Sequence, residues 1–452
     1  MKLTRRVALT AGLVAGVVIV VIVVLAVAGF LGIVRGTPLT RVRVVGGGGA
    51  PRGVADPRFV PAVERYAGVR LTPGHRVEVL LNGDGTYPRL WADLRSARRT
   101  LTVQLYYAKP SAMADTMAAL LAERARAGVR VLVLLDAFGS QDLVDAWRAR
   151  LPAAGIRFAV LRPLVWYNLD ELDNRSHVRA IVVDGRVGYT GGFGLADYWQ
   201  GEGHAPGEWR ETNVRFEGPA VTDLQAAFGI GWAEATGELL AGDPYFPPPD
   251  GAAAADASPD DAGGVMRSGR TRAGLLFTIP TNGSTPAERF MALSIAGARR
   301  TLHITNPYFV PDEHFQALLV DAVRRGVDVR VLMPGERSDV KATLYASRAR
   351  YERLLRGGVR LYEYRPVNVH AKTLVADGRW VTVGSMNFDN RSLALNEESN
   401  LVVDDAGVGA AMDSLFRHDL AFSQEVVLAR FRRRPWTSRV LEWAADLISP
   451  VL

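Results

Sequence analysis

The most constraining feature of this chain is an internal repeat of polar residues at fixed spacing. His177-Val178-Arg179 is followed by Asp184 and then by Gly191-Gly192-Phe193-Gly194. The second copy has His370-Ala371-Lys372, then Asp377, then Gly384-Ser385-Met386-Asn387, each at the same offset from its counterpart. Self-similarity of this kind indicates a duplicated structural unit, so the chain is expected to fold as two related halves.

The residues before these motifs repeat as well, and they predict the fold class. Ala97 to Leu101 returns as Ala298 to Leu302, and Gly128 to Leu132 returns as Gly326 to Arg330. In each half a β-rich run leads into a helix, which a glycine ends before a buried Val/Leu strand. Strands that alternate with helices favour an α/β sandwich with a mainly parallel or mixed sheet in each half. The 452 residues also exceed the roughly 250 to 300 that one hydrophobic core organises.

Composition shifts divide the chain into six expected segments. The glycines at 46–49 suit a tether, and the Pro/Ala/Asp-rich stretch from Asp243 to Gly264 suits a linker between the halves. The expected segments are a membrane anchor (1–34), a Gly-rich tether and lead-in (35–75), the first half (76–240), a linker (241–272), the second half (273–425) and an amphipathic tail (426–452).

An almost unbroken apolar run extends from Val7 to Val34, after Lys2, Arg5 and Arg6. It is longer than the roughly 20 residues that cross a bilayer, so it predicts one transmembrane helix and a single-pass anchor in the cell membrane. The alternative is a cleaved signal peptide, because Ala26-Val27-Ala28 resembles a cleavage site. The side of the membrane that carries the remaining chain stays open, since Arg35, Arg41 and Arg43 balance the basic residues before the helix.

The tail combines arginines with a helical apolar pattern. Arg430 and Arg432 to Arg434 precede Val440, Leu441, Ala444, Leu447 and Ile448 at helical spacing. We expect the apolar face of this helix to pack on the adjacent half. The alternative is that this basic, Trp-containing segment lies on a membrane surface.

The second motif carries the residue types that phosphodiester chemistry needs. If 370–375 is a strand, His370 and Lys372 project from the same face. An imidazole can act as nucleophile or acid, and a cation stabilises the charge that builds on the nonbridging oxygens. The chain contains no cysteine, which excludes disulfides, thiolate catalysis and Cys-ligated zinc. The seven histidines are otherwise scattered, so neither a metal site nor another cofactor is expected.

With these motifs the sequence resembles the phospholipase D superfamily, in which two copies of His-x-Lys-x4-Asp with Gly-Gly/Ser-x-Asn form one active site. The likeness covers both halves and is greatest to bacterial cardiolipin synthases. Further stretches that carry it are Asn82-Gly83-Asp84, Trp209-Arg210-Glu211-Thr212, Glu217-Gly218-Pro219-Ala220, Asn306-Pro307-Tyr308-Phe309-Val310-Pro311, and Asn390-Arg391-Ser392-Leu393 with Asn396 and Glu398.

The resemblance assigns expected roles to the repeated residues. His177 and His370 are the catalytic pair, with Glu211 as the partner of His177 and Glu398 as the partner of His370. Lys372, Arg179, Ser385, Asn387 and Gly192 are the expected phosphate-binding residues. Asp184 and Asp377 complete the motifs, but each begins an Asp-Gly turn, so a purely structural role is at least as well supported.

The first copy departs from the family pattern at two positions, because Arg179 replaces the usual lysine and Gly194 the usual asparagine. Arginine keeps the charge but has a larger planar head. We therefore expect a working, asymmetric site, in which Gly194→Asn together with Arg179→Lys increases turnover. Inactivity is the alternative.

The resemblance implies a phosphatidyltransferase that works through a phosphohistidine, with phosphatidylglycerol as donor and acceptor. Three alternatives stay open: a phospholipase D hydrolase that releases phosphatidic acid, a superfamily nuclease, and a non-catalytic lipid-binding protein. The net charge of +7 favours anionic partners. The expected partner is phospholipid substrate in the membrane, with no nucleic acid, and the oligomeric state stays open.

Overall fold

The computed structural model describes residues 51–163, 174–248, 267–280 and 285–451, together with the isolated positions 16, 19, 21 and 22. Most of the predicted membrane helix, the glycines at 46–49 and most of the predicted linker therefore lie outside the described residues. Within the described ranges, none of the helices has the length and hydropathy that crossing a bilayer requires.

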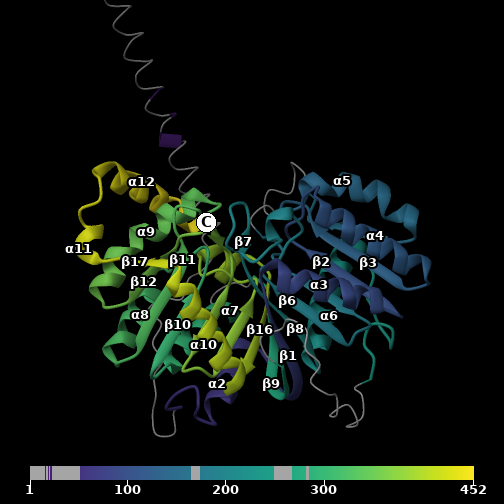
Figure 1. The fold of residues 1–452 in the computed structure, drawn as a ribbon, viewed down its shortest axis with the longest axis horizontal. Helices are drawn as coiled ribbons and strands as arrows, with labels where there is room; N and C mark the ends of the chain where they lie inside the picture. The colour runs from purple at the N-terminus through teal and green to yellow at the C-terminus, as the bar shows by residue number, and fades with distance from the viewer. Residues whose placement is uncertain are drawn as a thin grey trace, which may run out of the picture.

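Each half alternates strands and helices, and the second half repeats the order of the first (Figure 1). The first half comprises β1 (Thr72–Leu81), α3 (Asn82–Ser96), β2 (Thr100–Leu105), α4 (Ala112–Arg126), β3 (Arg130–Asp136), α5 (Gln141–Arg150), β4 (Arg157–Leu161), β5 (Ala180–Val183), β6 (Val187–Gly191), β7 (Trp209–Arg210), β8 (Thr212–Glu217) and α6 (Ala220–Thr236). The second comprises β9 (Arg267–Thr278), α7 (Pro286–Gly297), β10 (Thr301–Thr305), α8 (Glu313–Arg324), β11 (Asp328–Pro334), α9 (Lys341–Arg356), β12 (Arg360–Tyr364), β13 (Asn368–Val369), β14 (Thr373–Ala376), β15 (Trp380–Gly384), β16 (Glu398–Asp404), α10 (Ala406–Ala421) and β17 (Ser423–Glu425).

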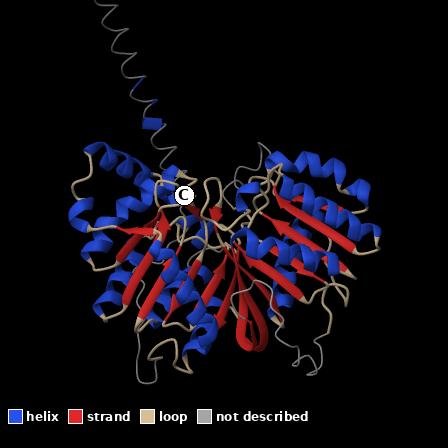
Figure 2. Cartoon of the chain, viewed as in Figure 1, coloured by secondary structure: helices blue, strands red, loops and turns tan. Residues whose placement is uncertain are grey.

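The strands of both halves, except β7 and β13, join into one sheet, which runs through the middle of the molecule between layers of helices (Figure 2). Its order is β17-β12-β11-β10-β14-β15-β16-β9-β1-β8-β6-β5-β2-β3-β4. The halves meet where β9 pairs antiparallel with β1. The parallel pairs are β2 with β3, β3 with β4, β10 with β11 and β11 with β12.

The sheet corrects one expectation and confirms another. The predicted strand-helix-strand repeat is present as β2-α4-β3 and β10-α8-β11. Of the two expected forms, mainly parallel or mixed, the sheet is mixed with antiparallel pairs predominating, and the two halves share this one sheet rather than each having its own. Antiparallel hairpins such as β5-β6 and β14-β15, which carry the motif turns, produce this difference.

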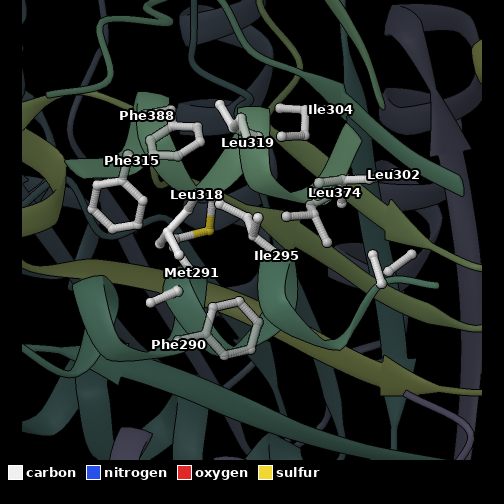
Figure 3. Close-up of a cluster of buried hydrophobic side chains, with 14 of the residues drawn as sticks. Phe290, Met291, Ile295, Leu302, Ile304, Phe315, Leu318, Leu319, Leu374 and Phe388 are labelled. Carbon is white, nitrogen blue, oxygen red and sulfur yellow. The ribbon is translucent and has the colours of Figure 1, made fainter. Parts of the chain in front are cut away.

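The hydrophobic cores follow from alternation along the strands. In β2, Leu101, Val103 and Leu105 point to one face and pack against α3 and α4. In β10, Leu302 and Ile304 pack against α7 and α8 in the same way, and Figure 3 shows them with Phe290, Ile295 and Leu319. Both halves therefore bury an equivalent face of their sheet. On the other face, α6 and α10 cover a core to which both halves contribute.

The segments at the edges of the halves differ from their expected forms. The expected lead-in contains α2 (Phe59–Ala67), whose Phe59 and Val63 lie in the core of the second half rather than the first. The expected linker ends early, because β9 begins at Arg267. The tail contains α11 (Leu428–Phe431) and α12 (Trp436–Leu447).

Candidate active site

A cavity of about 700 Å³ lies between the halves and receives side chains from both. It is lined by Tyr106, Tyr107, Lys109, Phe138, Gly139, Gln141, Asp142, Arg175, His177, Arg179, Trp199, Trp209, Tyr308, Asp339, Val340, Thr343, His370, Asn387, Asp389, Arg391, Ser392 and Asn396. The two motif histidines thus face one shared space, although the chain separates them widely.

Each histidine is bound by a carboxylate from the other half. Nδ1 of His177 lies 2.9 Å from Oε2 of Glu398, and Nδ1 of His370 lies 2.7 Å from Oε2 of Glu211. The expected pairing, Glu211 with His177 and Glu398 with His370, is therefore wrong. In the fold the partners are exchanged between the halves.

Backbone pairing between the halves explains the exchange. The amide of His177 donates to the carbonyl of Glu397, and the amide of His370 donates to the carbonyl of Arg210. β7 also pairs in parallel with β13, next to His370. Each histidine segment is thereby placed beside the carboxylate segment of the opposite half. The strand predicted over 370–375 begins later, at Thr373, because residues 370–372 belong to this crossing between β13 and β14.

The two motif cations are both buried. Nε of Arg179 donates to the carbonyl of Phe193 at 2.7 Å, and Nη1 donates to the carbonyl of His177. Nζ of Lys372 donates to the carbonyl of His370 at 2.6 Å. Burial lowers the pKa of Lys372 to about 7, although Glu211 opposes the shift. Arg179 lines the cavity, whereas Lys372 is not among the lining residues and its Nζ lies 2.9 Å from Nε2 of His370.

The two carboxylates differ in their electrostatics. Burial raises the pKa of Glu398 to about 8. The hydroxyl of Ser385, which donates to Oε2 at 2.5 Å, opposes this rise. Burial also opposes ionisation of Glu211, but His370 and Lys372 outweigh it, and the pKa of Glu211 falls to about 2. Burial lowers the pKa of both histidines, most strongly that of His177, which also lies near Arg179. Ionisation is therefore favoured at Glu211 and opposed at Glu398.

Of the remaining phosphate-binding candidates, one lines the cavity and two contact the carboxylates that bind the histidines. Asn387 lines the cavity, and within the described ranges its Oδ1 has no hydrogen-bond partner. Ser385 instead holds Glu398. Gly192 lies against Glu211, since a Cβ there would be 2.4 Å from Oε2 of that carboxylate. Ser385 and Gly192 thus contact the carboxylates rather than the cavity.

Asp184 and Asp377 lie at the opposite end of the hairpin strands and do not line the cavity. Oδ1 of Asp184 accepts from the amides of Arg99 and Thr100, and Oδ1 of Asp377 accepts from those of Arg300 and Thr301. Both have positive φ, 53° and 56°. The structural alternative therefore holds, and the catalytic expectation for these two residues is wrong, because their carboxylates cap the start of β2 and β10.

Trp199 is a residue that the sequence reasoning missed. It is buried, its ring lies edge-on to His370, and its indole nitrogen is 3.4 Å from Oε2 of Glu211. A Cβ on Gly194 would lie 2.7 Å from this ring. The tryptophan therefore fills the space that an asparagine at position 194 would need. The sequence signal for this residue was the glycine in place of asparagine at position 194, because close packing requires another side chain to fill the space that the asparagine would occupy.

These features define a phospholipase D-type enzyme, with two imidazoles, two buried cations and two carboxylates gathered from duplicated halves. The chain belongs to the phospholipase D superfamily and, within it, to the cardiolipin synthase family. The family model described as "Cardiolipin synthase, PLD-like domain" matches residues 292–420. The expected superfamily and enzyme class are thereby confirmed.

Curated relatives and a solved structure carry this assignment over most of the chain. A cardiolipin synthase of Geobacillus kaustophilus is 33% identical over 83% of this chain and 72% of its own length. Cardiolipin synthase A of Pseudomonas syringae is 32% identical over 86% of this chain and 79% of its own. The crystal structure of a phosphatidylserine synthase from Haemophilus influenzae matches with a TM-score of 0.65 and 13% identity, over 87% of this chain and 99% of that one. The last likeness concerns the fold alone.

Proposed function

We propose that this enzyme joins two phosphatidylglycerol molecules into cardiolipin and releases glycerol. The observation that carries the proposal is the placement of His177 and His370 on one cavity, each held at Nδ1 by a carboxylate of the opposite half. A carboxyl group at Nδ1 fixes the tautomer and leaves Nε2 as the nitrogen that forms a bond or moves a proton.

The proposed reaction has two displacements at phosphorus. In the first, one imidazole attacks the phosphorus of a phosphatidylglycerol, the bond to the headgroup glycerol breaks, and the other imidazole gives that glycerol its proton. In the second, a headgroup hydroxyl of another phosphatidylglycerol gives its proton to the imidazole that acted as the acid, and its oxygen attacks the phosphohistidine. Cardiolipin then leaves and both imidazoles are regenerated.

Charge on the nonbridging oxygens is offset by Arg179 and Lys372 in this proposal. Arg179 lines the cavity and keeps a full charge at any physiological pH. A buried cation interacts strongly with charge that develops in the transition state, because no water screens it. The unpartnered Oδ1 atoms of Asn387 and Asn396, within the described residues, suit the hydroxyls of a glycerol headgroup.

We also propose that the apolar run Val7 to Val34 anchors the enzyme in the cell membrane, where its substrate lies. The length and uninterrupted apolar character of the run support this.

Product analysis tests the reaction. Purified enzyme in mixed micelles of phosphatidylglycerol should form cardiolipin and glycerol in equal amounts. Phosphatidic acid as the sole lipid product would replace the transferase with a hydrolase. His177→Ala and His370→Ala should each lower kcat by more than the roughly 10²- to 10⁴-fold that a general acid contributes. An alkaline quench followed by peptide mapping should find one phosphohistidine, at position 177 or 370.

A further inference from the structure

Helix α12 exposes its apolar face and packs on the protein with the opposite face, unlike an ordinary surface helix. A surface helix normally buries its apolar stripe. In α12 the buried residues are Glu442 and Ala445, while Trp436 is 74% and Trp443 is 64% exposed. Val440 and Leu447 continue the exposed stripe. The expectation that the apolar face of the tail packs on the adjacent half is therefore wrong.

Polar contacts hold the helix in this orientation. Glu442 accepts from Nη2 of Arg434 at 2.6 Å, and Arg350 on α9 binds both Asp446 and Ser449. Removing the apolar stripe from water would be favourable, yet the ion pairs fix the opposite face on the protein. The fold thus maintains an exposed apolar surface that a soluble monomer would avoid.

The apolar stripe is bordered by positive charge. Arg430, Arg432, Arg433 and Arg439 are all exposed, on α11, on the turn before α12 and on its first turns. Tryptophans beside arginines are the composition that the interface of an anionic bilayer attracts, because the indole ring is amphipathic and the guanidinium binds phosphate.

The surface lies close to the active-site cavity. Ala445 packs with Val310 and Ala346, and Val310 follows the Tyr308 that lines the cavity. Nδ2 of Asn390 donates to the carbonyl of Pro450 at 2.7 Å, and its neighbour Arg391 lines the cavity. In Figure 1, α12 lies at the upper edge of the molecule. A lipid surface that touches α12 therefore reaches the part of the molecule that holds the cavity.

We propose that the exposed face of α12, with its flanking arginines, is a docking surface for an anionic phospholipid bilayer, which it brings to the cavity. The bilayer is favoured over a second copy of the chain by charge. Arg432 pairs with Glu352, but Arg430, Arg433 and Arg439 would repel their own counterparts in a two-fold interface. The inference does not depend on the reaction proposed above.

A fluorescent probe tests the docking directly, because the chain has no native cysteine to compete for labelling. Full-length Val440→Cys, labelled with an environment-sensitive dye, is reconstituted into vesicles of phosphatidylcholine with or without phosphatidylglycerol. The matched control is Tyr66→Cys, a 60% exposed position on α2, and this helix lies at the lower edge of the molecule in Figure 1. With phosphatidylglycerol, the dye at 440 should brighten and be quenched by doxyl-labelled lipid, while the dye at 66 should not.

Charge reversal tests the role of the arginines. Arg433→Glu removes one positive charge and adds a negative one, so the binding constant of the labelled face for the vesicles should fall at least about fivefold, given roughly 1 kcal/mol for each basic residue near an anionic surface. Arg324→Glu on α8 is the control and should change nothing. Equal dye signals at 440 and 66 in all lipids would overturn the proposal. So would a signal at 440 that appears only with rising protein density, which indicates a second copy.

A kinetic readout separates this inference from the proposed reaction. Val440→Asp should lower turnover of bilayer phosphatidylglycerol and leave turnover of short-chain monomeric phosphatidylglycerol unchanged. Equal loss on both substrates would contradict docking. If no variant turns over either lipid, the proposed reaction fails, and the dye measurements still decide the docking.

Discussion

Gly194 shows how a single departure from a family motif is accommodated. The position lacks the usual asparagine, and the ring of Trp199 occupies the space a side chain would need. The same tryptophan approaches Glu211, the carboxylate that binds His370. Glycine at 194 and tryptophan at 199 therefore form one packing unit, and the expectation that an asparagine at 194 improves the site conflicts with this geometry.

We predict that Gly194→Asn destabilises the protein and lowers kcat. A Cβ would lie 2.7 Å from the ring of Trp199 and 2.8 Å from the carbonyl oxygen of Tyr107, and overpacking of this kind costs about 1 to 3 kcal/mol. Denaturant unfolding and steady-state kinetics measure the two effects. Gly229→Asn is the control, because a Cβ there meets nothing within 4 Å. In the double variant with Trp199→Ala, the cost of Gly194→Asn should shrink, and full additivity would contradict the packing unit.

Glu398 predicts a pH dependence of stability. Its pKa is about 8 in the folded protein, against about 4.3 in an unfolded chain, so the folded state binds more protons between these values. Its contribution to stability is full below about pH 4.3 and is lost as the pH rises through about 8. The free energy of unfolding of the wild type, relative to Glu398→Gln, should therefore fall between about pH 6.5 and 8.

The matched control for this titration is Glu211→Gln. The pKa of Glu211 is lowered to about 2, so its contribution is present above about pH 4.3 and lost only as the pH falls through about 2. Its difference from the wild type should stay level between about pH 6.5 and 8. A level difference for Glu398→Gln as well would refute the assignment of a raised pKa.

The short strand β7 depends on contacts from both halves. Its Arg210 forms a bidentate ion pair with Asp419 of α10, and both side chains are 4% exposed. Its backbone carbonyl accepts from the amide of His370, and the next residue is Glu211. One buried ion pair thus fixes, across the boundary between the halves, the segment that carries the carboxylate bound to His370.

We predict that Asp419→Ala destabilises the protein by about 3 to 5 kcal/mol and lowers kcat, because it leaves Arg210 buried without its partner. Chemical denaturation and kinetics on mixed micelles measure both. The control is Asp145→Ala, which breaks an exposed pair with Arg148 and should cost less than about 1 kcal/mol. Similar costs for the two variants would remove Arg210 from its positioning role.

In the whole molecule, the two duplicated halves together form a single candidate active site. The two halves share a sheet through β1 and β9, and their histidine and carboxylate segments cross between them. Because each imidazole depends on a carboxylate of the other half, neither half contains a complete site. The asymmetry of the motifs then appears as an electrostatic asymmetry, with an ionised Glu211 on one side and a Glu398 of raised pKa on the other.

The sequence by itself determined the duplication, the α/β class, the superfamily and four of the residues that line the cavity, His177, Arg179, His370 and Asn387. Spacing carries this information because residue periods reflect strands and helices, and because His177 and His370 recur in one register. It also located the turns at Asp184 and Asp377, where an Asp-Gly pair favours a hairpin.

Only the tertiary structure decided which carboxylate binds which histidine, what fills the space beside Gly194 and which face of α12 is exposed. These depend on contacts between segments far apart in the chain, such as the amide of His177 with Glu397, Trp199 with Gly194, and Arg350 with Asp446. Local sequence patterns reflect the periodicity and propensity of helices and strands, but they do not show which residue of the other half a side chain will contact. A helix with an apolar stripe therefore looks the same in sequence whether that stripe meets the protein or faces outward.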